Sequence, residues 1–209
     1  MFITFEGIDG AGKSTQLALF AEDLRAAGYR VTRTREPGGT ALGERLRELL
    51  LAPGAAPPAP EAELAMMFAA RAQHAAEVIR PALARGEIVL CDRFTDASEA
   101  YQGVGRGLGR DAIADLHRIL LGDLWPDITV ILDLEPATAR ARSRGRGRAD
   151  RIEAEGLAFL SRVRQGYREI AAREPERCIV IPAEQPPEAV HAAIADAVRP
   201  RLPPSRPLS

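Results

Sequence analysis

Nine residues near the N-terminus, GIDGAGKST at 7–15, constrain the fold more than any other stretch. They fit the pattern G-x-x-x-x-G-K-[ST] and lie between an apolar, strand-like run and a helical pattern. Glycines let a backbone wrap closely around an anion, successive N–H groups point inward, and the N-terminus of the following helix adds a favourable dipole. The stretch therefore predicts a phosphate-binding loop between a strand and a helix.

Lys13 is the only lysine among the 28 lysine and arginine residues of the chain. An ammonium is compact and can move with a phosphoryl group, whereas the planar fork of arginine is bulkier and imposes another geometry. We therefore interpret Lys13 as a catalytic cation. Ser14 offers a hydroxyl to Mg²⁺ that bridges two phosphates. The other candidate ATP-binding residues of the loop are Gly7, Ile8, Asp9, Gly10, Ala11, Gly12 and Thr15.

Short apolar runs alternate with helix-length segments along the chain. Strands are expected at 2–6, 30–36, 87–92, 127–134 and 177–183. Helices are expected at about 13–27, 41–51, 61–84, 110–121, 136–145, 153–173 and 186–199. This alternation is typical of βαβ units. We predict an α/β fold of the P-loop NTPase type, with a parallel five-stranded sheet flanked by helices, a helical lid at about 140–152, and a disordered Pro-rich tail at about 201–209. All of it is expected to form a single domain, 1–209.

Bulk properties exclude several function classes. The net charge of −1 gives no long-range field for nucleic acid or a membrane surface, so neither partner is expected. The first residues lack the pattern of a secretory signal, and no apolar run has the length of a membrane span, so a cytoplasmic protein is expected. Cys91 and Cys178 each lie at one end of an apolar, strand-like run, which favours buried reduced thiols over a disulfide or a metal site.

Asp92 and Arg93 follow an apolar strand-like run, IVLC at 88–91. The carboxyl end of such a strand is where parallel sheets bind ligands. Asp92 is a candidate catalytic residue that holds a water on the metal ion, and Arg93 is a candidate for gripping two phosphates at once. A surface salt bridge is the alternative interpretation of this pair.

A basic segment, ARARSRGRGRADR at 139–151, carries six arginines. Gly145 and Gly147 weaken helix continuation and indicate a hinged flap. Dense positive charge on a movable flap favours closure over a polyphosphate. A solvated basic loop, or a contact with RNA, is the alternative.

Three classes of phosphate-loop protein are compatible with these features at first: a small-molecule kinase, a regulatory GTPase and an ATPase that drives a partner protein. A GTPase needs an N-K-x-D motif to read guanine, and the chain has no second lysine with which to build one. The partner-driving ATPase stays open, because two apolar runs end in Asp as a Walker B strand does.

Several further motifs in order, TREPGGT (34–40), FAARAQH (68–74), DRF (92–94), AYQG (100–103) and DRIE (150–153), make the chain resemble bacterial thymidylate kinase from residue 2 to about residue 200. The resemblance implies transfer of the γ-phosphoryl of ATP to dTMP with Mg²⁺, by a homodimer. Arg146 is then implied as the catalytic arginine of the flap, with Arg142 on the ATP side, because the phosphate loop itself carries no arginine. Another nucleoside monophosphate or deoxynucleoside kinase is the alternative.

The resemblance also implies a dTMP site. Asp9 would meet the 3′-hydroxyl, Arg71 the thymine carbonyl, Ser98 the base, and Tyr101 would crowd out a 2′-hydroxyl. The other implied dTMP-binding residues are Glu36, Arg47, Arg93 and Gln102. The chain departs from the family where an aromatic residue usually stacks on thymine, since Met67 occupies that position and Phe68 follows it. It also has Ala97 where relatives often carry Ser.

Overall fold

The computed structural model describes residues 1–53, 56–143, 151–152 and 155–204. Its centre is one parallel sheet with the strand order β2-β3-β1-β4-β5. The strands are β1 (Phe2–Glu6), β2 (Val31–Arg35), β3 (Ile88–Asp92), β4 (Ile128–Asp133) and β5 (Cys178–Pro182). The predicted α/β fold with a parallel five-stranded sheet is confirmed.

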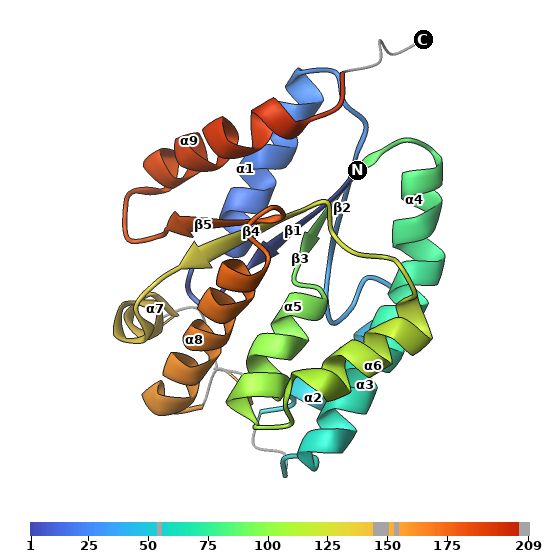
Figure 1. Ribbon diagram of the computed structural model, residues 1–209, viewed down its shortest axis with the longest axis vertical. Helices are drawn as coiled ribbons and strands as arrows, with labels where there is room; N and C mark the ends of the chain where they lie inside the picture. The colour runs from blue at the N-terminus through green and yellow to red at the C-terminus, as the bar shows by residue number, and fades with distance from the viewer. Residues whose placement is uncertain (54–55, 144–150, 153–154, 205–209) are drawn as a thin grey trace.

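Helices cover both faces of the sheet. They are α1 (Lys13–Ala26), α2 (Ala41–Leu51), α3 (Pro60–His74), α4 (Arg80–Ala84), α5 (Thr95–Ser98), α6 (Arg110–Leu121), α7 (Pro136–Ser143), α8 (Leu157–Arg173) and α9 (Pro187–Val198). α1 and α9 lie together on one face, whereas α4, α5, α6 and α8 gather on the other (Figure 1). The inner strands are therefore buried on both sides, which explains their continuous apolar runs.

Two helical segments differ from the prediction. The long helix expected at 61–84 consists of α3, a π-helical segment η1 (Ala75–Ile79) and α4. The segment at 95–105, for which no helix was predicted, forms α5 and the π-helical η2 (Glu99–Gly105). Nearly all of its residues are buried, and these include the polar residues Thr95, Asp96, Ser98, Glu99 and Gln102, so its polar positions do not mark a solvent-exposed helix face. Gly166 of α8 lets η2 approach closely, since a Cβ there would lie 3.1 Å from the Cα of Ala100.

The C-terminal segment follows α9 into a short 3₁₀ turn, η3 (Arg199–Arg201). Leu202 packs against the core, and the Tyr29 hydroxyl donates a 2.6 Å hydrogen bond to the carbonyl of Pro203. The predicted disorder therefore does not apply to 201–203, and 205–209 lie outside the described residues. No helix in the described ranges is both long and apolar enough to cross a bilayer.

Candidate active site

The phosphate loop follows β1 at the carboxyl edge of the sheet. Gly7 has φ 131°, and a Cβ at this position would lie 2.5 Å from the carbonyl oxygen of Leu132, so only glycine fits. Gly12, with φ 97°, precedes the first turn of α1. The loop thus turns sharply and ends at a helix N-terminus, which is the geometry that binds phosphate.

Lys13 begins α1, and its side chain is buried against the loop. Its Nζ donates to the carbonyl oxygen of Ile8 at 3.1 Å and lies 3.6 Å from Oδ1 of Asp9. Burial lowers the pKa of Lys13, as does the nearby Arg93, while Asp9 and Asp92 oppose the shift. The carboxylates thus favour the charged form of the only lysine in the chain.

Ser14 and Asp92, the two predicted metal residues, lie together although they are far apart in sequence. The Ser14 hydroxyl donates a 2.7 Å hydrogen bond to Oδ2 of Asp92. Hydroxyl and carboxylate oxygens are the hard donors that Mg²⁺ prefers, so this pair fits the ion. No group of three or more His, Cys, Asp or Glu side chains suited to a metal occurs in the described part of the chain. The protein supplies few ligands here, as in sites where substrate phosphates and waters complete the shell.

Arg93 lies between the phosphate loop and a cavity beside it that is described below. It follows β3 with a left-handed backbone, φ 73°, the one such non-glycine residue in the described ranges. Its Nη2 donates to Asp9 at 2.7 Å and to the Tyr101 hydroxyl at 3.0 Å. Its guanidinium carbon lies 4.7 Å from the centroid of the Tyr101 ring. A non-glycine residue in this conformation is strained, and such strain is typical of functional sites.

The charge state of Asp9 follows from these contacts. Burial alone would raise its pKa, but the charges of Arg93 and Lys13 and the hydrogen bonds from Arg93 and Tyr101 outweigh burial and hold the pKa below its usual range. Burial also raises the pKa of the Tyr101 hydroxyl. At neutral pH the Asp9 carboxylate is therefore ionised and can accept hydrogen bonds, and the neighbouring Tyr101 hydroxyl is neutral.

A cavity of about 520 Å³, open solvent at its mouth included, lies beside the loop. The predicted dTMP residues that line it are Asp9, Glu36, Arg47, Met67, Arg71, Arg93, Ser98, Tyr101 and Gln102, and Ala97 lies there as well. A second hollow is formed by the phosphate loop, and it shares Asp9, Glu36, Arg47 and Arg93 with the first. The structure thus brings the two predicted sites together.

Arg71 is fixed at the bottom of the cavity by hydrogen bonds. Its Nε donates to Glu36 at 2.6 Å, its Nη1 to the Ser98 hydroxyl at 3.0 Å, and its Nη2 to the Phe94 carbonyl at 2.9 Å. The other carboxylate oxygen of Glu36 forms a 2.8 Å hydrogen bond with Nδ1 of His74. Sequence reasoning missed His74, although it lies three residues after Arg71 on the same helix and closes the motif RAQH.

Met67 and Phe68 have different surroundings. Met67 lines the cavity. Phe68 does not: its ring is completely buried under Arg71, whose guanidinium carbon lies 4.6 Å from the ring centroid. Of the two predicted stacking residues, the geometry keeps Met67 in reach of a ligand and gives Phe68 the role of supporting Arg71.

Two further predicted residues, Arg47 and Arg142, donate hydrogen bonds to backbone carbonyl oxygens. Arg47 donates to the carbonyl oxygen of Pro37 at 2.9 Å. Arg142 donates to the carbonyl oxygens of Ala183 and Glu184 at 2.7 and 3.0 Å, so its guanidinium contacts the segment after β5. Arg146 and most of the predicted lid, 144–150, lie outside the described residues.

Comparisons with known proteins agree with this geometry. The family model described as thymidylate kinase matches residues 5–194. A thymidylate kinase from Pseudomonas putida is 56% identical over 202 residues, covering 97% of both chains. One from Trichlorobacter lovleyi is 50% identical over 208 residues, covering 97% of this chain and 98% of the relative. A crystal structure of thymidylate kinase from Ehrlichia chaffeensis superposes with a TM-score of 0.80 at 37% identity, covering 95% of this chain and 98% of that one. The chain therefore belongs to the thymidylate kinase family.

Proposed function

We propose that this protein transfers the γ-phosphoryl of ATP to dTMP and releases dTDP and ADP. The observation that carries the proposal is the shared wall of the two hollows. Asp9 and Arg93 line both the phosphate loop and the deep cavity beside it. A donor in the loop and an acceptor in the cavity would therefore meet at these two side chains, as direct transfer between two nucleotides requires.

On the donor side, Lys13 and the N–H groups of the loop hold the phosphates. Ser14 and Asp92 are the residues that would hold Mg²⁺. When bound, this ion neutralises charge on the β- and γ-phosphates. Phosphoryl transfer needs mainly positioning and charge stabilisation, and these side chains supply both.

On the acceptor side, Arg71 and Ser98 present fixed donors for the carbonyl edge of a pyrimidine. Asp9, held ionised, accepts a hydrogen bond from the 3′-hydroxyl. The Tyr101 ring, which is buried and whose hydroxyl donates to Asp9, would crowd out a 2′-hydroxyl on a sugar bound there. Met67 packs on the base through its polarisable thioether. The cavity thus selects a deoxyribonucleotide with a pyrimidine base.

Between the two sides, Arg93 contacts the acceptor phosphate and the transferred group. Arg146, carried by the lid, adds the second guanidinium on the charge that develops during transfer. Arg142 serves the ATP side by fixing the segment at 183–184.

We also propose a cytoplasmic homodimer that binds neither nucleic acid nor a membrane. Support for the dimer comes from apolar side chains exposed on and after α6, since Ile119 is 66% exposed, Leu120 44% and Trp125 39%. An apolar surface of this kind favours burial against a second copy. Sedimentation velocity of the purified protein tests this, and a single species of monomer mass would contradict it.

The function is tested by ATP consumption in the presence of Mg²⁺, with dTMP, dUMP, dCMP, dGMP, AMP or thymidine in separate reactions. We expect turnover with dTMP, weaker turnover with dUMP, and none without an acceptor. Preference for another nucleotide would indicate a different nucleoside monophosphate kinase. Equal consumption without any acceptor would overturn the kinase and favour the partner-driving ATPase.

A further inference from the structure

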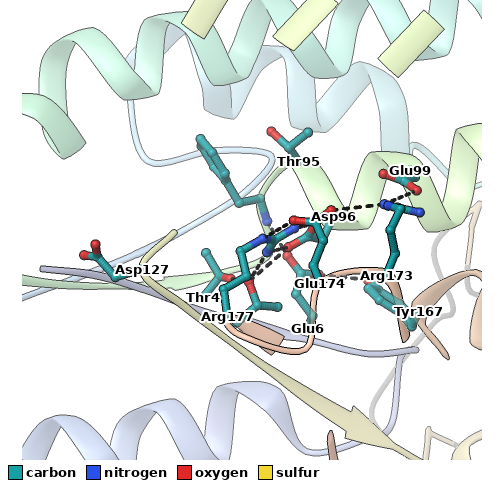
Figure 2. Close-up of polar contacts among 12 residues, drawn as sticks. Thr4, Glu6, Thr95, Asp96, Glu99, Asp127, Tyr167, Arg173, Glu174 and Arg177 are labelled. Atoms are coloured by element: carbon teal, nitrogen blue, oxygen red, sulfur yellow. Dashed lines mark hydrogen bonds and ion pairs between the residues drawn. The ribbon is translucent and has the colours of Figure 1, made fainter. Parts of the chain in front are cut away.

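Glu6 is a buried carboxyl group that lines neither hollow. It ends β1, directly before the phosphate loop, and its side chain is completely inaccessible to solvent. One of its oxygens accepts a 2.7 Å hydrogen bond from the backbone N–H of Phe94, and the other accepts a 2.8 Å hydrogen bond from the Tyr167 hydroxyl. Figure 2 shows Glu6 and Tyr167 next to a network of acidic and basic residues.

Tyr167 connects Glu6 to Arg93. It comes from α8 and is also buried, and its hydroxyl oxygen accepts a 3.3 Å hydrogen bond from Nη1 of Arg93. The other terminal nitrogen of Arg93 donates to Asp9 and Tyr101. The guanidinium is therefore held from two sides, by the loop and Tyr101 on one and by Tyr167 on the other.

The backbone around Arg93 is held by the same end of β1. The left-handed conformation of a non-glycine residue is strained, so neighbouring contacts must fix it. The N–H of Arg93 donates to the carbonyl oxygen of Phe5 at 3.0 Å, and the N–H of Phe94 donates to the Glu6 side chain. Glu6 thus constrains Arg93 through its backbone and, by way of Tyr167, through its guanidinium.

We propose that Glu6 and Tyr167 are positioning residues for phosphoryl transfer, which hold Arg93 in the orientation that grips the reacting phosphates. This inference rests on the proposed function. Neither residue touches a substrate in the arrangement described, and both act through Arg93.

A separate network of charged side chains, centred on Arg177, lies behind Glu6. Arg177 donates two hydrogen bonds to Asp96, at 2.7 and 2.8 Å (Figure 2). It donates a third to Thr129 at 2.7 Å. These groups satisfy one another and do not contact Arg93. Burial, reinforced by the Asp96 carboxylate, raises the pKa of Glu6, and the hydrogen bonds from Tyr167 and Phe94, which stabilise the ionised acceptor, oppose that rise.

Two substitutions test the proposal from opposite ends. In Glu6→Gln the amide oxygen can still accept a hydrogen bond from the N–H of Phe94, but the amide N–H₂ group can only donate to the Tyr167 hydroxyl. That hydroxyl oxygen already accepts a hydrogen bond from Arg93. Tyr167→Phe removes that hydroxyl and keeps the ring. We expect each to lower kcat with dTMP about tenfold while KM for ATP stays within about twofold, because only an interaction of the reacting group is weakened.

Thr4→Val is the matched control. Thr4 lies on the same strand and is equally buried, with its hydroxyl 3.0 Å from that of Thr129 and without a link to Arg93. We expect this variant to keep kcat within about twofold of the parent. If Glu6→Gln does not fold, Tyr167→Phe carries the test, since its loss of one hydroxyl leaves the packing intact.

A double-mutant cycle separates positioning from a structural role. In an Arg93→Ala background, assayed with proportionally more enzyme, Tyr167→Phe should cause no further loss of kcat, because the group it positions is gone. Equal losses in both backgrounds would overturn the inference, as would an unchanged kcat for Tyr167→Phe in the wild-type background while dTMP is turned over normally. A parent protein that phosphorylates no nucleotide would overturn the proposed function and this inference with it.

Discussion

Arg93 offers a perturbation that separates activity from stability. Its φ of 73° is strained for any residue with a Cβ and free of strain for glycine. Arg93→Gly and Arg93→Ala both remove the guanidinium, and with it the 2.7 Å ion pair to Asp9 and the contacts with Tyr101 and Tyr167. The two variants therefore lose the same interactions and differ only in how their backbones tolerate this conformation.

The difference in their unfolding free energies follows from two opposing terms. Alanine in the left-handed region destabilises the folded state by roughly 1–2 kcal/mol relative to glycine. Glycine loses more conformational freedom on folding, which favours alanine by about 0.4–1 kcal/mol. The strain term is larger, so Arg93→Gly is expected to be more stable than Arg93→Ala by about 0.5–1 kcal/mol. At an ordinary exposed position the alanine variant would be the more stable of the two.

Urea denaturation of both variants, with m-values compared, measures this difference, and steady-state kinetics with dTMP measures the activity. We expect both variants to lose at least about a hundredfold in kcat, as the removal of one electrostatic stabiliser usually does. The alanine variant being the more stable one would refute the strain argument. Near-normal turnover in either variant would refute the catalytic role of Arg93.

Two further predictions concern site residues, and a third concerns the buried His117. Lys13→Ala should lower kcat at least about a hundredfold with the fold intact by circular dichroism, and normal turnover would remove Lys13 from the mechanism. Arg146→Ala should lower kcat more than Arg142→Ala, because the latter guanidinium is already bound to the carbonyl oxygens at 183–184; equal effects would mean that the lid acts as a diffuse positive field. Burial lowers the pKa of His117 to about 4, so the unfolded chain binds more protons between pH 6.5 and 4. The His117 contribution to the unfolding free energy should fall by up to about 3 kcal/mol over that range, and a His117→Gln variant with the same acid dependence in urea titrations would contradict this.

The sequence predicted those parts of the fold that depend on local patterns. β1, β3, β4 and β5 are mainly apolar runs, β2 alternates Thr with Arg after Val31, and the phosphate loop has a fixed spacing, so these elements could be found without tertiary information. The helical segment at 95–105 could not. Its polar residues, such as Asp96 and Glu99, are buried together with its apolar ones, so the alternation of polar and apolar positions does not follow a buried and an exposed helix face.

The same limit applies within the site. Arg71, Ser98 and Tyr101 were predicted from motifs that resemble a family. Glu6 and Tyr167 were not predicted, because they are 161 residues apart and meet only when α8 packs on the sheet. The choice between Met67 and Phe68 also needed the structure, since it depends on which side of α3 faces the cavity.

The most direct test of the account follows the phosphoryl group itself. ATP labelled at the γ-phosphate is incubated with dTMP, Mg²⁺ and the purified protein, and the products are separated by chromatography. We expect the label in dTDP, at the rate at which ADP forms, with none above background in inorganic phosphate. Label that appears in inorganic phosphate at the same rate with or without dTMP would contradict transfer between the two adjoining sites.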